Sequence, residues 1–160
     1  MLKIADDGEL KDAIYNKSIE KAKALTFKNS NIKDDSLKLL RGVAGPLSVA
    51  TLDLSQNFSF ITDAAVEILC ELAIFPGLRV LNLADNQITD DSLVLMARCG
   101  WMGKLEQLVL YGNSDISSEG LVILAESPTI RHLKLLDLHA TSVDDEGVSY
   151  FLKTESCGEL

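Results

Sequence analysis

Asp137 and His139 are the two side chains whose types and spacing could do chemistry. Residues two apart in a strand project from the same face, so a carboxylate would stand beside an imidazole and orient it as a general base. A nucleophile must complete such a site, and Ser55 lies three predicted strands away, or about 14 Å at ordinary strand spacing. Tyr111 carries the only nearby hydroxyl, so we predict that the chain is not an enzyme.

The residue types that bind metals and phosphates are not grouped for that purpose. His132 lies in a predicted turn with no His or Cys at ligand spacing, and no glycine-rich phosphate loop occurs. We therefore expect no metal and no cofactor. Cys70, Cys99 and Cys157 are odd in number and form no CxxC motif, which predicts free thiols in a reducing, intracellular compartment, the cytoplasm.

The net charge limits the classes of partner. The 160-residue chain carries a formal charge of −9 at pH 7, which opposes nonspecific binding to nucleic acid or to an anionic membrane. The N-terminus has acidic residues where a targeting signal needs basic ones, and no apolar run approaches the roughly 18 residues of a membrane helix. We expect a protein partner, with no nucleic acid and no membrane.

These side chains must be positioned by the elements of a repeat. Its five copies read ALTFKNSNI, TLDLSQNFSFI, VLNLADNQI, QLVLYGNSDI and LLDLHATSV. Their first leucines are separated by 27, 29, 27 and 28 residues: Leu25, Leu52, Leu81, Leu108 and Leu136. Apolar residues alternate in the first half of each copy, which predicts a short strand.

The second half of each copy predicts a helix. Apolar residues follow helical spacing, as in the pairs Leu93 with Met96 and Val148 with Phe151. Acidic or hydroxyl residues precede these helices and suit their N-terminal ends. The pairs 34–35, 90–91 and 144–145 are both Asp and are predicted to share one phase of the repeat. They would serve capping and solubility, or form a docking stripe for a basic partner.

The pattern LxxLxLxxNxI followed by a helix resembles the leucine-rich repeat superfamily. The period is similar to that of its ribonuclease-inhibitor-like and cysteine-containing subclasses. The resemblance implies an α/β fold: a right-handed solenoid forming a curved arc, with parallel strands on the concave side and helices on the convex side. Residues 19–160 would form five repeats. Residues 1–18 would form an N-terminal capping helix or half repeat, with Leu2 and Ile4 in a vestigial strand.

The resemblance also assigns a role to the asparagine of the pattern. It implies that the side chains of Asn57, Asn86 and Asn113 bond to backbone groups in the bend after each strand and link neighbouring repeats. Ser30 and Thr141 replace asparagine in the first and last copies. A hydroxyl supplies only part of that bonding, so we expect weaker coupling at both ends.

The concave side holds the predicted protein-binding residues. Strand positions between the inward leucines project there, including Ser55 and Ala84, and the last two strands form an amphipathic patch suited to protein contacts. A solvated, unoccupied face is the alternative. The strand residues assigned to binding are Asp53, Val109, Tyr111, Leu135, Asp137 and His139.

Aromatic residues outside the leucine pattern are further candidates. QNFSFITD is longer than the matching DNQITD, and Ile61 takes the inward place of Ile88, so Phe58 and Phe60 are additional. We predict that one covers the core of the bend and that the other protrudes as a protein contact. Trp101 would either cover the core from below or anchor a contact.

The sequence favours a non-catalytic protein-protein interaction module, such as a scaffold or structural subunit of a larger assembly. The alternatives are a regulator of enzyme activity, resembling leucine-rich-repeat GTPase activators or inhibitors, and a fragment of a longer leucine-rich repeat protein. The closing SCGEL repeats a turn phrase that precedes strands elsewhere, which predicts a sixth repeat. We expect the open C-terminal repeat to be covered by another subunit or by missing repeats, unless its end is simply frayed.

Overall fold

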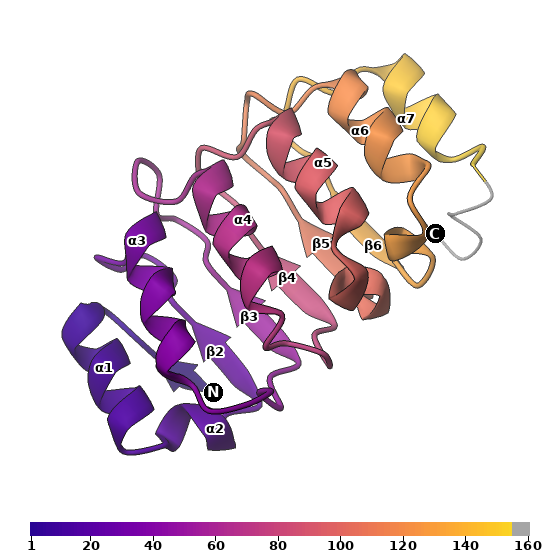
Figure 1. Ribbon diagram of the computed structural model, residues 1–160. Helices are drawn as coiled ribbons and strands as arrows, with labels where there is room; N and C mark the ends of the chain where they lie inside the picture. Colours follow the sequence, from indigo (N-terminus) through magenta and orange to yellow (C-terminus); the bar gives the residue numbers. More distant parts are fainter. Residues whose placement is uncertain (155–160) are drawn as a thin grey trace.

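The computed structural model describes residues 1–154, so Cys157 and the turn phrase at 156–160 lie outside the described residues. Short strands and helices alternate along the chain, and Figure 1 shows the helices in one row over one side of a single sheet. Within the described range the sheet has six parallel strands in sequence order: β1 (Leu2–Lys3), β2 (Ala24–Thr26), β3 (Thr51–Asp53), β4 (Val80–Asn82), β5 (Gln107–Val109) and β6 (Leu135–Asp137). This is the α/β architecture of a leucine-rich-repeat solenoid.

The strand register confirms the alignment of the repeats. The first leucines of the five copies are direct partners across the sheet, from Leu25 on β2 to Leu136 on β6. Four of them are at most 1% exposed, while Leu136 at the end of the sheet is partly buried. Strand β1 pairs with β2, so the predicted vestigial strand exists.

The helices lie on the other side of the chain from the concave strand surface. They are α1 (Asp7–Tyr15), α2 (Ser18–Lys21), α3 (Asp34–Leu37), α4 (Asp63–Leu72), α5 (Asp90–Arg98), α6 (Ser118–Ala125) and α7 (Asp145–Phe151). Three 3₁₀ helices complete the returns: η1 (Lys38–Gly42), η2 (Gly100–Lys104) and η3 (Pro128–Ile130). None of the helices described between residues 1 and 154 is long and apolar enough to cross a membrane.

The outer side of the last helix differs from the prediction. Leu93 and Met96 of α5 are at most 1% exposed, and Phe151 of α7 is 3% exposed. Val148, predicted to face inward, is 39% exposed. The reason is its position, because within residues 1–154 no helix packs against α7 on the side away from α6.

The asparagines form the predicted ladder between repeats. The side-chain amide of Asn57 donates to the carbonyl oxygens of Phe27 at 3.0 Å and Leu54 at 2.8 Å, one in each of two repeats. Asn86 and Asn113 repeat this pattern one and two repeats later. Thr141 donates to Leu138 of its own repeat, so a hydroxyl keeps only the local half of the bonding. All three asparagines are buried.

A second ladder, which the sequence did not predict, links the helix N-termini. Thr62 donates its N–H and its hydroxyl to the carboxylate of Asp34, at 2.9 and 2.8 Å. Thr89 bonds to Asp63 in the same way, and Ser117 bonds to Asp90. The first acidic residue of each of these helices is therefore held by the next repeat.

The last junction reverses this arrangement. Ser118 occupies the first helical position, where earlier repeats have aspartate, and its hydroxyl donates to Asp144 at 2.7 Å. Asp144 is the N-cap of α7, whereas Asp34 and Asp90 are first helical residues. The predicted common phase of the three acidic pairs is therefore wrong by one residue for the third pair.

Candidate functional site

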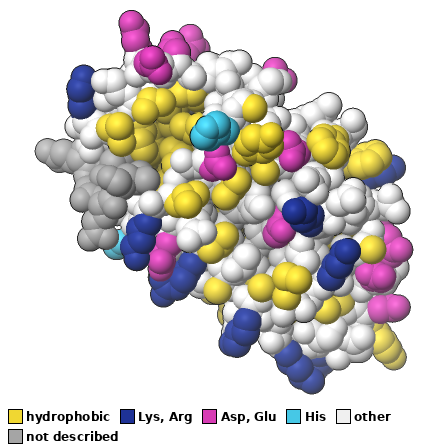
Figure 2. Space-filling view, turned by 180° about the vertical axis from the view of Figure 1, so that it is seen from behind, with side chains coloured by type: hydrophobic (Ala, Val, Ile, Leu, Met, Phe, Trp, Pro, Cys, Tyr) yellow, Lys and Arg dark blue, Asp and Glu magenta, His cyan; other side chains and the backbone are white. Residues whose placement is uncertain are grey.

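Five of the predicted binding residues lie together on the last two strands. We call Val109, Tyr111, Leu135, Asp137 and His139 the β5–β6 patch. Val109 is the direct partner of Asp137 across the sheet. Beyond the strand ends, Gly112 donates to the carbonyl of His139 at 3.0 Å, which brings Tyr111 alongside His139. Figure 2 shows hydrophobic side chains gathered beside a histidine on this face of the molecule.

The β5–β6 patch exposes apolar surface in a polar frame. Tyr111 and Leu135 are each 42% exposed, and Val109 is partly buried between them and the core. The equivalent positions on β4 are Val80 and Asn82, which are only partly exposed. Large side chains on strands hold their positions at little entropic cost, which suits them to protein contacts.

The Asp137–His139 pair has a local structural role. Asp137 Oδ1 lies 3.4 Å from His139 Nδ1 and also accepts the backbone N–H of His139 at 3.1 Å. Asp53 accepts the N–H of Ser55 in the same way at 3.0 Å. The carboxylate therefore closes the turn that ends the strand, and this bond accounts for its spacing.

Ser55 does not occupy the predicted place on the concave face. It is 2% exposed, and its hydroxyl is buried without a hydrogen-bond partner. Ala84, one repeat later, is also buried at 8%. The prediction was wrong here because β3 ends at Asp53 and the chain then turns inward through Gln56, whose φ is +61°. No side chain near His139 was predicted to replace Ser55 as a nucleophile.

Asp53 stands apart from the β5–β6 patch. It lies on β3, two strands from β5, or about 10 Å at ordinary strand spacing. Thr26 donates its hydroxyl to Asp53 at 3.3 Å. Asp53 also borders a hollow of about 320 Å³ that Lys3 and Lys28 line. Its surroundings are therefore polar and basic, unlike those of Tyr111 and Leu135.

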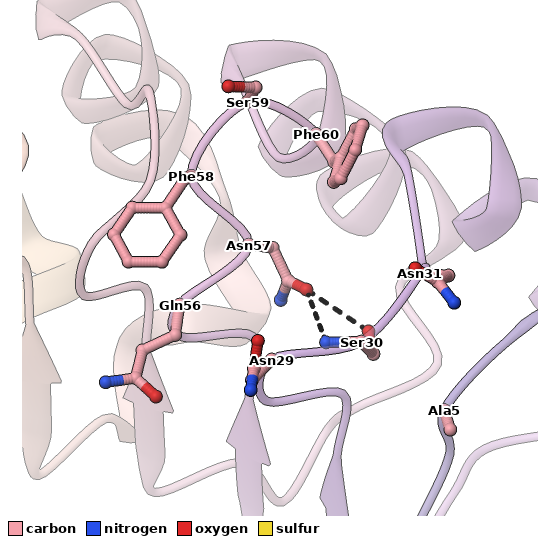
Figure 3. Close-up of a pocket in the computed structure, with 9 residues that line it drawn as sticks. All are labelled: Ala5, Asn29, Ser30, Asn31, Gln56, Asn57, Phe58, Ser59 and Phe60. Carbon is pink, nitrogen blue, oxygen red and sulfur yellow. Dashed lines mark hydrogen bonds between the residues drawn. The ribbon is translucent and has the colours of Figure 1, made fainter.

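Neither phenylalanine of the long bend covers its core. Phe58 is 59% exposed and Phe60 is 43% exposed, while Ile61 is fully buried. Phe60 donates its N–H to the carbonyl of Asn57 at 2.8 Å, and this turn breaks the extended geometry assumed from the sequence. Figure 3 shows the two rings pointing to opposite sides of the bend. The prediction that one of them is a core residue is wrong, because Asn57 and Ile61 already fill that space.

The bend nevertheless forms a surface of its own. Phe58, Phe60 and the Asn57 backbone line a hollow of about 320 Å³ with Asn29 and Ser30 from the preceding repeat (Figure 3). The ammonium of Lys33 lies 5.5 Å from the centre of the Phe60 ring, within range of a cation–π contact. This hollow and the β5–β6 patch are separate surfaces, which the sequence had grouped together.

Trp101 packs rather than projects. Its ring lies 6.0 Å from the ring of Phe75, at an angle of 52°. The side chain is partly buried against the core, and its indole nitrogen is buried. Of the two alternatives for Trp101, the structure shows the packing one.

The edge opposite the helix N-termini carries a charge cluster that the sequence reading missed. Arg79 and Lys134, one on each side, both form ion pairs with Glu106. Their hydrogen bonds, first from Arg79 and then from Lys134, hold the pKa of Glu106 below its usual range. Each precedes a strand by one residue, and this shared phase was the signal that could have revealed them. Among residues 1–154, no three His, Cys, Asp or Glu side chains are grouped to hold a metal.

Comparisons with known proteins agree with the repeat. The family described as Leucine Rich repeat matches residues 78–97. A comparison with curated proteins finds no match. Among solved structures, the tropomodulin C-terminal domain of Caenorhabditis elegans is similar, with a TM-score of 0.62 and 14% identity over 92% of this chain and 89% of that chain. The internalin inlF of Listeria monocytogenes has a TM-score of 0.57 and 20% identity.

The internalin likeness covers 96% of this chain but 37% of the internalin chain. At these identities the two structures show the fold alone, and the ribonuclease-inhibitor-like or cysteine-containing subclass stays a prediction. The matching family, the repeated leucines in register and the shared fold together identify the chain as a leucine-rich repeat protein.

Proposed function

We propose that the chain is a non-catalytic protein-interaction module and that the β5–β6 patch is its main contact surface. The observation that carries the proposal is the pair Tyr111 and Leu135, each 42% exposed on neighbouring strands of one face. Exposed large apolar residues grouped on a rigid sheet are typical of protein contacts.

The chemistry of the patch indicates the kind of partner segment it suits. Tyr111 and Leu135 offer apolar surface, and Asp137 and His139 offer a carboxylate and an imidazole beside it. A partner segment with an apolar side chain flanked by a basic residue would match both parts. The net charge of −9 adds long-range attraction for such a partner.

We further propose that the chain serves as a scaffold or structural subunit, in the intracellular setting that its cysteines predict. The outer side of the last described repeat supports this. Val148 is 39% exposed and Leu152 is 59% exposed, and Leu136 and Leu138 of β6 are only partly buried. Another subunit or further repeats covering this side would bury apolar surface that water now reaches.

Quantitative affinity capture from the source cells tests the proposal. The double variant Tyr111→Ser/Leu135→Ser should lose a partner that the unaltered chain enriches. Ile123→Ser is the matched control, because Ile123 is 43% exposed on α6 and lies outside the patch. Equal enrichment by the unaltered chain and the double variant would overturn the assignment of the patch.

A further inference from the structure

Two cysteines from neighbouring repeats meet between the helices. Cys70 lies in α4, and Cys99 follows α5, which packs beside α4. Cys70 is partly exposed, and Cys99 is 6% exposed. Both are free thiols, and the thiol of Cys70 donates a hydrogen bond to the sulfur of Cys99. The sulfur atoms are therefore in contact, although 29 residues separate them in sequence.

The sulfur of Cys99 is surrounded by hydrogen-bond donors. Besides Cys70, the backbone N–H groups of Met102 and Trp101 face it, and so does the indole N–H of Trp101. That indole nitrogen is buried and has no other hydrogen-bond partner among the described residues. A buried donor without an acceptor is costly, and a thiolate at Cys99 would supply the acceptor.

The two thiols consequently differ in acidity. The Cys70 hydrogen bond, followed by the donors of Met102 and Trp101, lowers the pKa of Cys99 against the opposing effect of burial. The same Cys70–Cys99 hydrogen bond, with burial, raises the pKa of Cys70. Cys99 therefore loses its proton first and becomes the nucleophile, while Cys70 stays a thiol beside it.

We propose that Cys70 and Cys99 form a peroxide-reactive dithiol that closes into a disulfide between neighbouring repeats. The Cys99 thiolate attacks one oxygen of a hydroperoxide and the O–O bond breaks. Cys99 becomes a sulfenic acid, and the other oxygen leaves with a proton as water or an alcohol. The sulfur of Cys70 then attacks the sulfenic sulfur. Hydroxide leaves and takes the Cys70 proton, so two thiols are oxidised and one hydroperoxide is reduced.

Hydrogen peroxide added to a Cys157→Ser variant tests the proposal, since that background leaves only the two thiols. Intact mass should fall by about 2 Da, and alkylation by N-ethylmaleimide under denaturing conditions should then label neither Cys70 nor Cys99. The single tryptophan, Trp101, should lose fluorescence in the same time course, because a neighbouring disulfide quenches it. A reducing thiol should reverse both changes.

Matched variants separate this chemistry from general oxidation. Cys70→Ser in the same background should stop at a sulfenic acid that dimedone traps, and Cys99→Ser should show neither the disulfide nor the trapped adduct. Trp101→Phe should slow disulfide formation at least about threefold while its circular dichroism stays unchanged, since it loses only one donor to the thiolate. Two alkylatable thiols after peroxide, or equal dimedone labelling of the two serine variants, would overturn the proposal.

Discussion

The backbone N–H of Asn57 donates a 3.1 Å hydrogen bond to the side-chain oxygen of Asn86. Asn86 in turn donates from its amide nitrogen to Leu54 at 3.0 Å and to Leu83 at 2.9 Å. One buried side chain therefore satisfies backbone groups in two repeats, on both of its polar atoms. Stability of the inner repeats should depend on these asparagines more than on any exposed polar residue.

Asn86→Ala should lower the free energy of unfolding by roughly 3 kcal/mol, because three buried backbone groups lose a partner. Urea denaturation followed by circular dichroism measures the change. Asn31→Ala is the control, since Asn31 is exposed and bonds through its backbone. Equal losses in both variants would contradict the ladder as the source of stability.

Asp90→Ala should cost about 2 kcal/mol, because Ser117 loses the carboxylate that accepts both its N–H and its hydroxyl. Asp91→Ala should have a much smaller effect, since Asp91 is exposed. Thermal unfolding of the two variants in parallel distinguishes a junction role from general helix capping. If the Asp91 variant were the less stable of the two, the junction role would be refuted.

Gly120→Ala should destabilise the chain, because an added Cβ would lie 2.6 Å from Cγ of Asp90 and 2.9 Å from its Cβ. Either the carboxylate moves and loses Ser117, or α5 and α6 separate. Gly103→Ala, with nothing within 4 Å of the added carbon, should leave the unfolding temperature nearly unchanged. Differential scanning calorimetry of the pair checks this expectation.

Stability should fall in acid partly through Asp144. Hydrogen bonds from Gly147 and then Ser118 hold the pKa of Asp144 below its ordinary 3.8. A carboxyl with a lowered folded pKa contributes stability that is present above about pH 4 and is lost as pH falls through the folded pKa. Urea midpoints measured from pH 7 downward should show Asp144→Asn less stable at pH 7, with the difference narrowing below pH 4. A constant difference would contradict the assignment.

Phe58→Gly should preserve or slightly raise stability, because Phe58 is 59% exposed and its φ of +28° strains a side chain with a Cβ. Ile61→Ala should cost about 2–4 kcal/mol, since Ile61 is fully buried. Chemical denaturation measures both. A large loss for Phe58→Gly would restore the packing role that we had predicted for one phenylalanine.

The sequence was sufficient to predict the strands, their register and the asparagine ladder. Those features repeat, so each copy supports the interpretation of the others, and Leu81 aligned with Leu108 before any coordinates existed. The bends are different because each is unique. The left-handed residues Gln56 and Phe58 redirect the chain there, and spacing alone does not reveal a positive φ.

The contacts between repeats were also beyond the sequence reading. Asp63 was read as a capping residue, yet it accepts hydrogen bonds from Thr89, 26 residues later. Likewise, Cys70 and Cys99 formed no recognisable motif, because their meeting depends on how α4 packs against α5. Binding residues on one strand pair, such as Tyr111 and His139, could be grouped in advance, but their separation from Phe58 could not.

The reversed pair Ser118 and Asp144 affects how such an array can lengthen. Repeats joined through an aspartate followed by a threonine or serine are interchangeable, so duplicating one of them leaves every junction matched. A copy of the repeat that carries Asp90, inserted directly before the repeat that begins with Asp144, would place two carboxylates against each other. The array can therefore grow by duplication in its interior, while its last described junction accepts only a repeat that carries a hydroxyl in place of Asp90.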